Sequence, residues 1–247
     1  MRSALILPCY NVERNVEQVI TQLIPLIKKG IIKEIIAVDD GSKDNTLKIL
    51  KKYESNNFII IKHEKNKGKG KAMDNAAKLA IKRKIDAFVF FDADGEHDIQ
   101  VIEKSLKKLK NYDVIYGSRF RETKKEKVLI ARMLMAQVFA CLFKRLFNIN
   151  TTDPYCGFKA IKARAYQKIS PKEERYDIEL EMLIKAKIRK LKTAEIKIPL
   201  LNVAKWKIEY EKKKKKSISD FANWIDAQVE VIKKIIKEEN YELNVKI

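Results

Sequence analysis

The sequence predicts an α/β protein with a mostly parallel sheet, and three observations carry that prediction. Short apolar segments rich in β-branched residues alternate with longer segments of helical periodicity, which is the pattern of repeated βαβ units. The 247 residues, 46% of them hydrophobic, suffice for one large domain or two small ones with a buried core. Only 7 glycines and 5 prolines leave little room for low-complexity architecture or long linkers.

The first half of the chain predicts five strands separated by four helices. Each strand is a short run of β-branched or aromatic residues, and each helix carries an apolar stripe at three- and four-residue spacing. The strands are expected at 4–7, 35–38, 58–61, 87–91 and 114–116, and the helices at 12–29, 44–53, 71–82 and 99–109. The uninterrupted apolar run at 87–91 is typical of a buried central strand.

The pattern changes after Arg119. We expect an amphipathic helix at 128–147, an irregular turn at 153–158, a short helix near Arg164, a helix at 177–187 and a strand at 194–198. Residues 1–204 are expected to form one domain, followed at 205–247 by a basic segment and an amphipathic helix. This helix is expected to begin after Ser217, an N-cap with Asp220 in capping-box spacing. Its apolar stripe comprises Ile218, Phe221, Ile225, Val229, Ile232 and Ile236.

The charge balance indicates an anionic partner. The chain has 53 Lys and Arg against 33 Asp and Glu, a formal net charge of +20.

The most membrane-like stretch of the chain, 128–147, contains Arg132 and Lys144, which enclose only 11 residues. Spanning a bilayer takes about 20 apolar residues, so we expect no membrane span there.

The N-terminus and the cysteines favour a cytoplasmic protein. The first residues lack the longer apolar region and the cleavage site of a secretory signal. The three cysteines, Cys9, Cys141 and Cys156, are odd in number and widely spaced. This argues against a disulfide framework or a zinc cage, and we interpret all three as packing residues.

Polar segments follow three of the expected strands, at 8–11, 39–42 and 92–97. In open α/β sheets, ligands bind beyond the carboxyl ends of the strands. The acidic pairs in the last two segments would repel each other unless a cation or a donor-rich ligand lay between them.

Asp92, Asp94 and Glu96 occupy alternate positions after the fourth strand, so their carboxylates could converge on one cation. Mg²⁺ prefers oxygen ligands, uses one or two carboxylates and completes its shell with water and substrate phosphates. The alternative is that these acids cap the following helix. The acids at the other strand ends favour the metal site.

The lysine- and glycine-rich loop at 65–71 leads into a helix, which suits anion binding by backbone N–H groups and lysine charge. A solvated turn is the alternative. The loop lacks the Walker A spacing, and the chain has no Gly-x-Gly-x-x-Gly fingerprint.

Seven motifs follow one another along the chain. They are Leu7-Pro8-Cys9-Tyr10-Asn11, Val38-Asp39-Asp40-Gly41-Ser42 with Asp44 and Thr46, Asn66-x-Gly68-Lys69-Gly70, Asp92-Ala93-Asp94-Gly95-Glu96-His97, Gly117-Ser118-Arg119, Asp153-x-x-Cys156-Gly157-Phe158-Lys159 and Asp177-x-Glu179. Together and in this order they resemble family 2 glycosyltransferases, and more narrowly the branch of dolichyl- or polyprenyl-phosphate mannose or glucose synthases. The resemblance covers about residues 3–200.

The resemblance implies an inverting transferase of the nucleotide-diphospho-sugar (GT-A type) fold that uses a UDP- or GDP-sugar, a lipid-phosphate acceptor and Mg²⁺ or Mn²⁺. It places Asp94 as the principal metal ligand, with Asp92 and Glu96, and Arg119 on the diphosphate or the acceptor phosphate. The remaining substrate contacts it implies are Pro8, Tyr10, Glu13, Val38, Asp40, Lys69, Asp92, Ala93, Asp177 and Glu179.

The acceptor decides whether the reaction needs a general base. A lipid phosphate is largely ionised near neutral pH, whereas a hydroxyl must lose its proton to a carboxylate. Asp153, Asp177 and Glu179 are the candidates for that base, although the last two could equally anchor a helix. The usual Arg and Ser-Lys acceptor motif is replaced by Lys212 to Lys216 and Ser217.

The two amphipathic helices allow two interpretations. They are ordinary core-facing helices, or, with the basic runs beside them, they dock on an anionic membrane at its cytoplasmic face. Both can hold at once.

Three other function classes each fit part of the sequence. The first is a transferase acting on a sugar hydroxyl. A sugar-1-phosphate nucleotidyltransferase would have a related sheet, but the glycine-rich signature after the first strand is absent. A nucleic-acid-binding module would fit the pI of 9.7 but leaves the acidic strand ends unexplained, so no nucleic-acid partner is expected.

Overall fold

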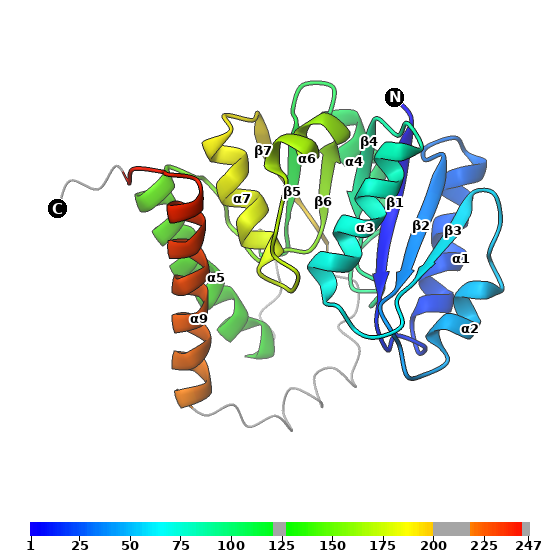
Figure 1. Cartoon of the computed structure of the whole chain (residues 1–247), viewed down its shortest axis with the longest axis horizontal. Helices are drawn as coiled ribbons and strands as arrows, with labels where there is room; N and C mark the ends of the chain where they lie inside the picture. The colour runs from blue at the N-terminus through cyan, green and yellow to red at the C-terminus, as the bar shows by residue number, and fades with distance from the viewer. Residues whose placement is uncertain (121–126, 200–217, 244–247) are drawn as a thin grey trace.

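A seven-stranded sheet forms the centre of the computed structural model, which describes residues 1–120, 127–199 and 218–243 (Figure 1). The strands lie in the order β3-β2-β1-β4-β6-β5-β7. Their bounds are β1 (Ser3–Cys9), β2 (Glu34–Asp39), β3 (Phe58–Lys62), β4 (Ala87–Phe90), β5 (Val114–Ser118), β6 (Lys159–Lys162) and β7 (Thr193–Lys197). The six strands expected from the sequence are confirmed.

Strand β6 is the one departure from the predicted parallel sheet. It runs antiparallel to both neighbours and lies between β4 and β5, whereas the other adjacent pairs are parallel. The sequence did not predict it, because four residues with lysines at both ends give no strand signal on their own. Because β6 runs antiparallel between β4 and β5, the 153–158 turn that precedes it lies at the edge of the sheet where β4 and β5 end.

Helices cover both faces of the sheet. The core on one face includes side chains of α1, α2 and α4, and the core on the other includes side chains of α3, α5, α6, α7 and α9. Their bounds are α1 (Val16–Lys28), α2 (Thr46–Lys51), α3 (Lys69–Lys82), α4 (Gln100–Lys108), α5 (Lys127–Phe147), α6 (Ala163–Ile169), α7 (Ile178–Ile188) and α9 (Ile218–Glu238). Because both faces are covered, strands such as β2 and β4 are buried along their whole length.

The C-terminal helix α9 packs against α5 and α7 (Figure 1). Trp224 contacts Phe139 of α5, and Lys234 pairs with Glu173 at 2.8 Å. Of the predicted stripe, Ile232 is buried and Ile225, Val229 and Ile236 are half-buried, while Ile235 is a buried residue that the stripe omitted. The cap at Ser217 and Asp220, the side chains of Ile218 and Phe221, and the basic segment up to 217 lie outside the described residues. The division at 204/205 stays a prediction.

The cysteines correct one expectation. Cys9 and Cys156 are buried, as expected of packing residues, and burial raises the pKa of the Cys156 thiol to about 12. Cys141 is exposed on α5, so its interpretation as a packing residue is wrong. Helix α5 is apolar around most of its circumference, so its sequence does not reveal which face is buried.

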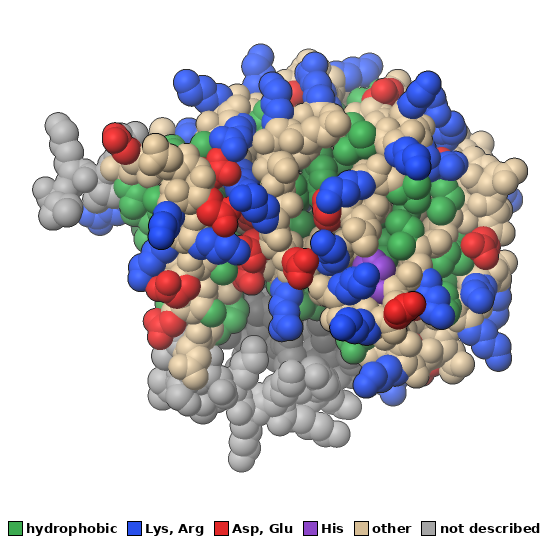
Figure 2. Space-filling model, in the orientation of Figure 1, with side chains coloured by type: hydrophobic (Ala, Val, Ile, Leu, Met, Phe, Trp, Pro, Cys, Tyr) green, Lys and Arg blue, Asp and Glu red, His purple; other side chains and the backbone are tan. Residues whose placement is uncertain are grey.

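Lys and Arg side chains are spread over the face seen in Figure 2 and are interrupted by acidic and apolar ones. Within the described ranges, no helix combines the length and the apolar character needed to cross a bilayer.

Replacing Phe88 by alanine tests the central core. Phe88 is fully buried on β4, where its ring lies 5.4 Å from that of Phe90 and 5.3 Å from that of Tyr166. We expect Phe88→Ala to lower the free energy of unfolding by about 3–5 kcal/mol in urea denaturation, because it leaves a cavity. The exposed control Val138→Ala should change it by less than about 0.5 kcal/mol. A loss below about 1 kcal/mol for Phe88→Ala would contradict the described packing.

Candidate functional site

The polar segments after β1, β2 and β4 meet at one edge of the sheet, the lower edge in Figure 1. Cys9 at the end of β1 is in register with Asp39 at the end of β2, and the Asp40 N–H donates to the Cys9 carbonyl at 2.8 Å. On the other side of β1, the Phe91 N–H donates to the Ile6 carbonyl at 3.0 Å. The predicted convergence of the strand ends is therefore confirmed.

Lys69 is the electrostatic centre of this edge. Its ammonium lies 2.8 Å from Asp92 after β4 and 2.9 Å from Glu179 of α7. Burial alone would lower the pKa of Lys69, but the two carboxylates outweigh burial and raise it above its ordinary value. Burial would likewise raise the pKa of Asp92, and Lys69 brings it well below the usual range. Lys69 and Asp92 are therefore both charged at neutral pH.

Gly157 makes room for this cluster. A Cβ atom at position 157 would overlap the Asp92 carboxylate and lie 2.6 Å from the Lys69 ammonium. The turn before β6 therefore requires glycine here, because any side chain would displace one of the two charged groups.

Arg119 and Asp153 form a second ion pair at the same edge. The Arg119 backbone N–H and Nε donate to Asp153 Oδ2 at 3.0 and 2.7 Å, and Nη2 donates to Oδ1 at 2.9 Å. Burial would lower the pKa of Arg119, but its contacts with Asp153 raise it. Both oxygens of the buried Asp153 thus accept bonds from Arg119, so its geometry favours orienting Arg119 over accepting a proton.

Asp40 shapes the loop before Lys69. Its carboxylate accepts the backbone N–H groups of Lys67 and Gly68, both at 2.9 Å, and lies 2.6 Å from His63 Nδ1. Gly68 supports this turn with a φ of +96°, and a Cβ there would overlap the Glu174 carbonyl. These two N–H groups are therefore used internally, and the loop offers the site its Lys69 side chain.

The remaining predicted substrate contacts divide into exposed and buried groups. Tyr10 is exposed, Pro8 is half-buried, and Val38 and Ala93 are buried. Glu13 links two segments, since its Oε2 accepts the backbone N–H of Asn45 at 2.8 Å.

The three predicted metal ligands are not assembled into one cluster. The described ranges hold no group of three His, Cys, Asp or Glu side chains arranged for a metal ion. Asp92 faces Lys69, and Asp94 Oδ1 accepts the Glu96 N–H at 3.1 Å. Nor do these acids cap α4, because Asp98 accepts the Gln100 N–H at 2.9 Å. The carboxylates of Asp92 and Asp94 follow a strand end and are hard oxygen ligands. They fit a cation that takes its other ligands from a substrate, rather than one held in a preformed cage of protein ligands.

Among the described residues, Asp177 takes part in no ion pair. Its Oδ1 accepts a bond at 3.1 Å from Gln228 of α9, so it anchors the C-terminal helix. Glu179, two residues later, faces Lys69. The sequence left open whether these acids anchor helices or act as bases, and both are engaged as anchors in this structure.

The sequence did not reveal three residues that support the site: His63, Asn75 and Glu195. His63 holds Asp40, and its Nε2 lies 2.9 Å from the Asn75 side-chain nitrogen. Glu195 of β7 binds the loop that carries Asp153. None of the three belongs to a motif, and their roles depend on strand and helix packing that local patterns do not encode.

A protein-family model described as glycosyl transferase family 2 matches residues 4–170. The chain is 33% identical over 213 residues to a UDP-N-acetylglucosamine–dolichyl-phosphate N-acetylglucosaminyltransferase of Methanococcus voltae, covering 78% of this chain and 83% of that protein. It is 31% identical over 223 residues to a dolichyl-phosphate beta-glucosyltransferase of Saccharomyces cerevisiae, covering 79% and 65%.

The fold is also similar to that of solved structures. Glucosyl-3-phosphoglycerate synthase from Mycobacterium tuberculosis, crystallised with Mn²⁺, UDP and glucosyl-3-phosphoglycerate, superposes with a TM-score of 0.61 at 18% identity. The match covers 84% of this chain and 75% of that one. The predicted GT-A type fold is thereby confirmed.

Hydrogen exchange tests the role assigned to Asp40. We expect Asp40→Asn to speed exchange of the Lys67 and Gly68 backbone N–H groups at least tenfold by NMR. An asparagine side chain has one acceptor oxygen, so it cannot bind these two N–H groups and His63 at the same time. Amides of β1 should be unaffected. The control Asp113→Asn, at an acid that binds Lys192 and Lys162 instead, should leave both loop amides protected. Unchanged protection in Asp40→Asn would show that Asp40 does not hold the loop.

Proposed function

The chain belongs to glycosyl transferase family 2, and from that premise we propose that it transfers a sugar from a UDP- or GDP-sugar to a polyprenyl phosphate. The names of the relatives support the acceptor class. The observation that carries the proposal is the pair of mostly buried cations, Lys69 and Arg119, held beside Asp92 at the carboxyl edge of the sheet. Arg119 is close enough to Asp92 for each to shift the pKa of the other.

The two cations suit the departure of a nucleoside diphosphate. Negative charge gathers on the diphosphate as the glycosidic bond breaks, and fixed positive groups stabilise that charge in the transition state. Lys69 and Arg119 are already oriented by carboxylates, so they need little reorganisation when the donor binds. Direct attack by the acceptor from the opposite side of the sugar would invert its configuration.

We assign Asp92 and Asp94 as the residues that would hold a Mg²⁺ or Mn²⁺ ion, with Glu96 nearby in sequence. When bound, such an ion supplies further positive charge to the leaving diphosphate. The Mn²⁺ in the Mycobacterium structure supports a divalent ion for this fold. Asp92 would then exchange part of its contact with Lys69 for the ion, leaving the ammonium to the phosphates.

The carboxylates favour a phosphate acceptor. Asp153 is bound to Arg119, Glu179 to Lys69 and Asp177 to Gln228, so each candidate base is engaged by a partner. A lipid phosphate is ionised near neutral pH and needs none of them. A hydroxyl acceptor, the alternative, would require one carboxylate to leave its partner.

A membrane-bound acceptor calls for a membrane-facing surface, which we place on α5 and the basic segment. Leu134 and Val138 are 54% and 62% exposed on α5, and Lys144 and Arg145 follow them on the same helix. The segment Lys212 to Lys216 adds five positive charges, each contributing on the order of 1 kcal/mol at an anionic surface. The protein would act peripherally at the cytoplasmic face, with nucleic acid playing no part.

Replacing Asp94 by alanine tests the metal assignment. We expect Asp94→Ala to lower sugar transfer to a polyprenyl phosphate by at least about 100-fold, because the diphosphate loses its bound ion. Circular dichroism should show an unchanged fold. Asp98→Ala, which removes the neighbouring acid at the start of α4, should keep most of the activity. Near-normal metal-dependent turnover by Asp94→Ala would overturn the assignment.

Vesicle sedimentation tests the membrane surface. Neutralising Lys212 to Lys216 with glutamine should reduce binding to vesicles containing anionic lipid, because the attraction to the surface is lost. Neutralising the exposed Lys104, Lys107, Lys108 and Lys110 of the α4 region provides a control of similar charge and should have a smaller effect. Equal losses in the two variants would mean that binding reflects overall charge rather than this segment.

A further inference from the structure

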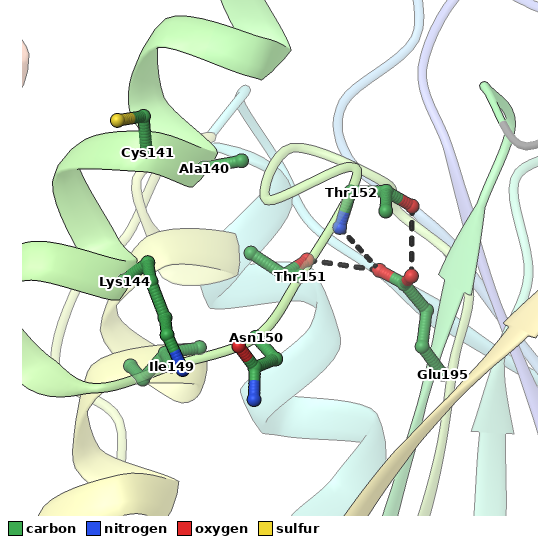
Figure 3. Close-up of a pocket in the computed structure, with 8 residues that line it drawn as sticks. All are labelled: Ala140, Cys141, Lys144, Ile149, Asn150, Thr151, Thr152 and Glu195. Atoms are coloured by element: carbon green, nitrogen blue, oxygen red, sulfur yellow. Dashed lines mark hydrogen bonds between the residues drawn. The ribbon is translucent and has the colours of Figure 1, made fainter.

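Glu195 on the edge strand β7 binds two consecutive threonines of the loop that precedes Asp153 (Figure 3). Its Oε1 accepts the Thr151 hydroxyl at 2.9 Å and the Thr152 backbone N–H at 2.8 Å. Its Oε2 accepts the Thr152 hydroxyl at 2.7 Å. One carboxylate therefore fixes two side chains and the backbone between them.

The two threonines lead directly to Arg119. The Thr152 hydroxyl is hydrogen-bonded to Ser118, the residue before Arg119. The Thr151 hydroxyl accepts the backbone N–H of Asp153 at 3.3 Å, and Asp153 holds the guanidinium. Glu195 is thus connected to Arg119 along two short paths, one through Ser118 and one through Asp153.

The loop depends on these polar contacts because one side of it lacks packing. A pocket of about 480 Å³ opens between the loop, α5 and β7 (Figure 3). Its lining includes Ala140 and Lys144 of α5, the two threonines and Glu195. Residues 148–153 also belong to no helix or strand. Bonds to a carboxylate are stronger than bonds between neutral groups, so Glu195 supplies much of what orders this side of the loop.

We propose that Glu195 is a positioning residue for Arg119, which it orients through Thr151, Thr152 and Asp153 without touching the substrate. The inference rests on the proposed function, in which Arg119 stabilises charge on a phosphate. Loss of Glu195 would leave Arg119 and Asp153 present but displaced, and a displacement near 1 Å can cost about 100-fold in rate. The effect should fall on kcat more than on the KM of the donor.

Three variants separate positioning from general stability. Glu195→Ala removes all three acceptors, and we expect kcat to fall about 10- to 100-fold with the donor KM changed less than about threefold. Glu195→Gln keeps one oxygen that can accept from the Thr151 hydroxyl and the Thr152 N–H, and its NH₂ group can donate to the Thr152 hydroxyl. We therefore expect Glu195→Gln to retain at least about a third of the parent kcat. Glu103→Ala removes a surface carboxylate paired with Lys107 on α4 and should behave as the parent protein.

A double-mutant cycle tests the path. Arg119→Lys loses the bidentate ion pair with Asp153, so Glu195 no longer has a guanidinium to orient. Adding Glu195→Ala to Arg119→Lys should therefore lower kcat by less than about a further twofold. Effects that multiply would overturn the proposal, as would a normal kcat in Glu195→Ala.

The Arg119 Nε–H signal in NMR gives a second readout that needs no activity. We expect it to be protected from exchange in the parent protein and to broaden or shift in Glu195→Ala, but not in Glu103→Ala. If the parent protein transfers no sugar, the proposed function fails while this signal still tests the positioning. An unchanged signal would overturn the proposal.

Discussion

A single lysine ammonium joins three segments that are far apart in the sequence. Lys69 at the start of α3 holds Asp92, which follows β4, and Glu179 of α7. Without it, two mostly buried carboxylates would share one site, and removing one partner of such a pair typically costs about 3–5 kcal/mol. The surrounding residues serve this contact, since Asp40 fixes the loop before Lys69 and Gly157 leaves space for the ion pair. The geometry of the strand edge therefore depends on Lys69.

Partners within the protein explain how acidic side chains can lie at neighbouring strand ends in this chain of net charge +20. Asp40 is satisfied by backbone N–H groups and His63, Asp92 by Lys69, and Asp153 by Arg119. Asp92 and Asp153 thus have counter-charges within the protein before any ligand arrives. A diphosphate with a divalent ion would add both signs of charge and could replace some of these internal contacts. The site is thus preorganised, which limits the reorganisation that transfer requires.

Local patterns carried much of the fold and part of the site. The alternation of strands and helices, and the acids after the strands at 35–38 and 87–91, are properties of short segments and could be predicted. Strand β6, the exposure of Cys141 and the role of Glu195 could not. Each depends on which element packs beside which: β6 is too short to signal itself, α5 is apolar on most sides, and Glu195 acquires its role only when β7 pairs with β5. The motifs placed Asp40, Arg119 and Asp153 at the site, but they revealed neither His63 as the partner of Asp40 nor the pairing of Arg119 with Asp153.

Calorimetric titration with UDP-sugars and GDP-sugars, in Mn²⁺ or Mg²⁺ and again in EDTA, tests whether the paired charges at the strand edge form a binding site for a nucleotide sugar and a divalent ion. We expect saturable binding of one nucleotide class that weakens at least tenfold in EDTA. Equal affinity with and without the ion, or no binding of either class while polyanions such as nucleic acid bind tightly, would contradict it.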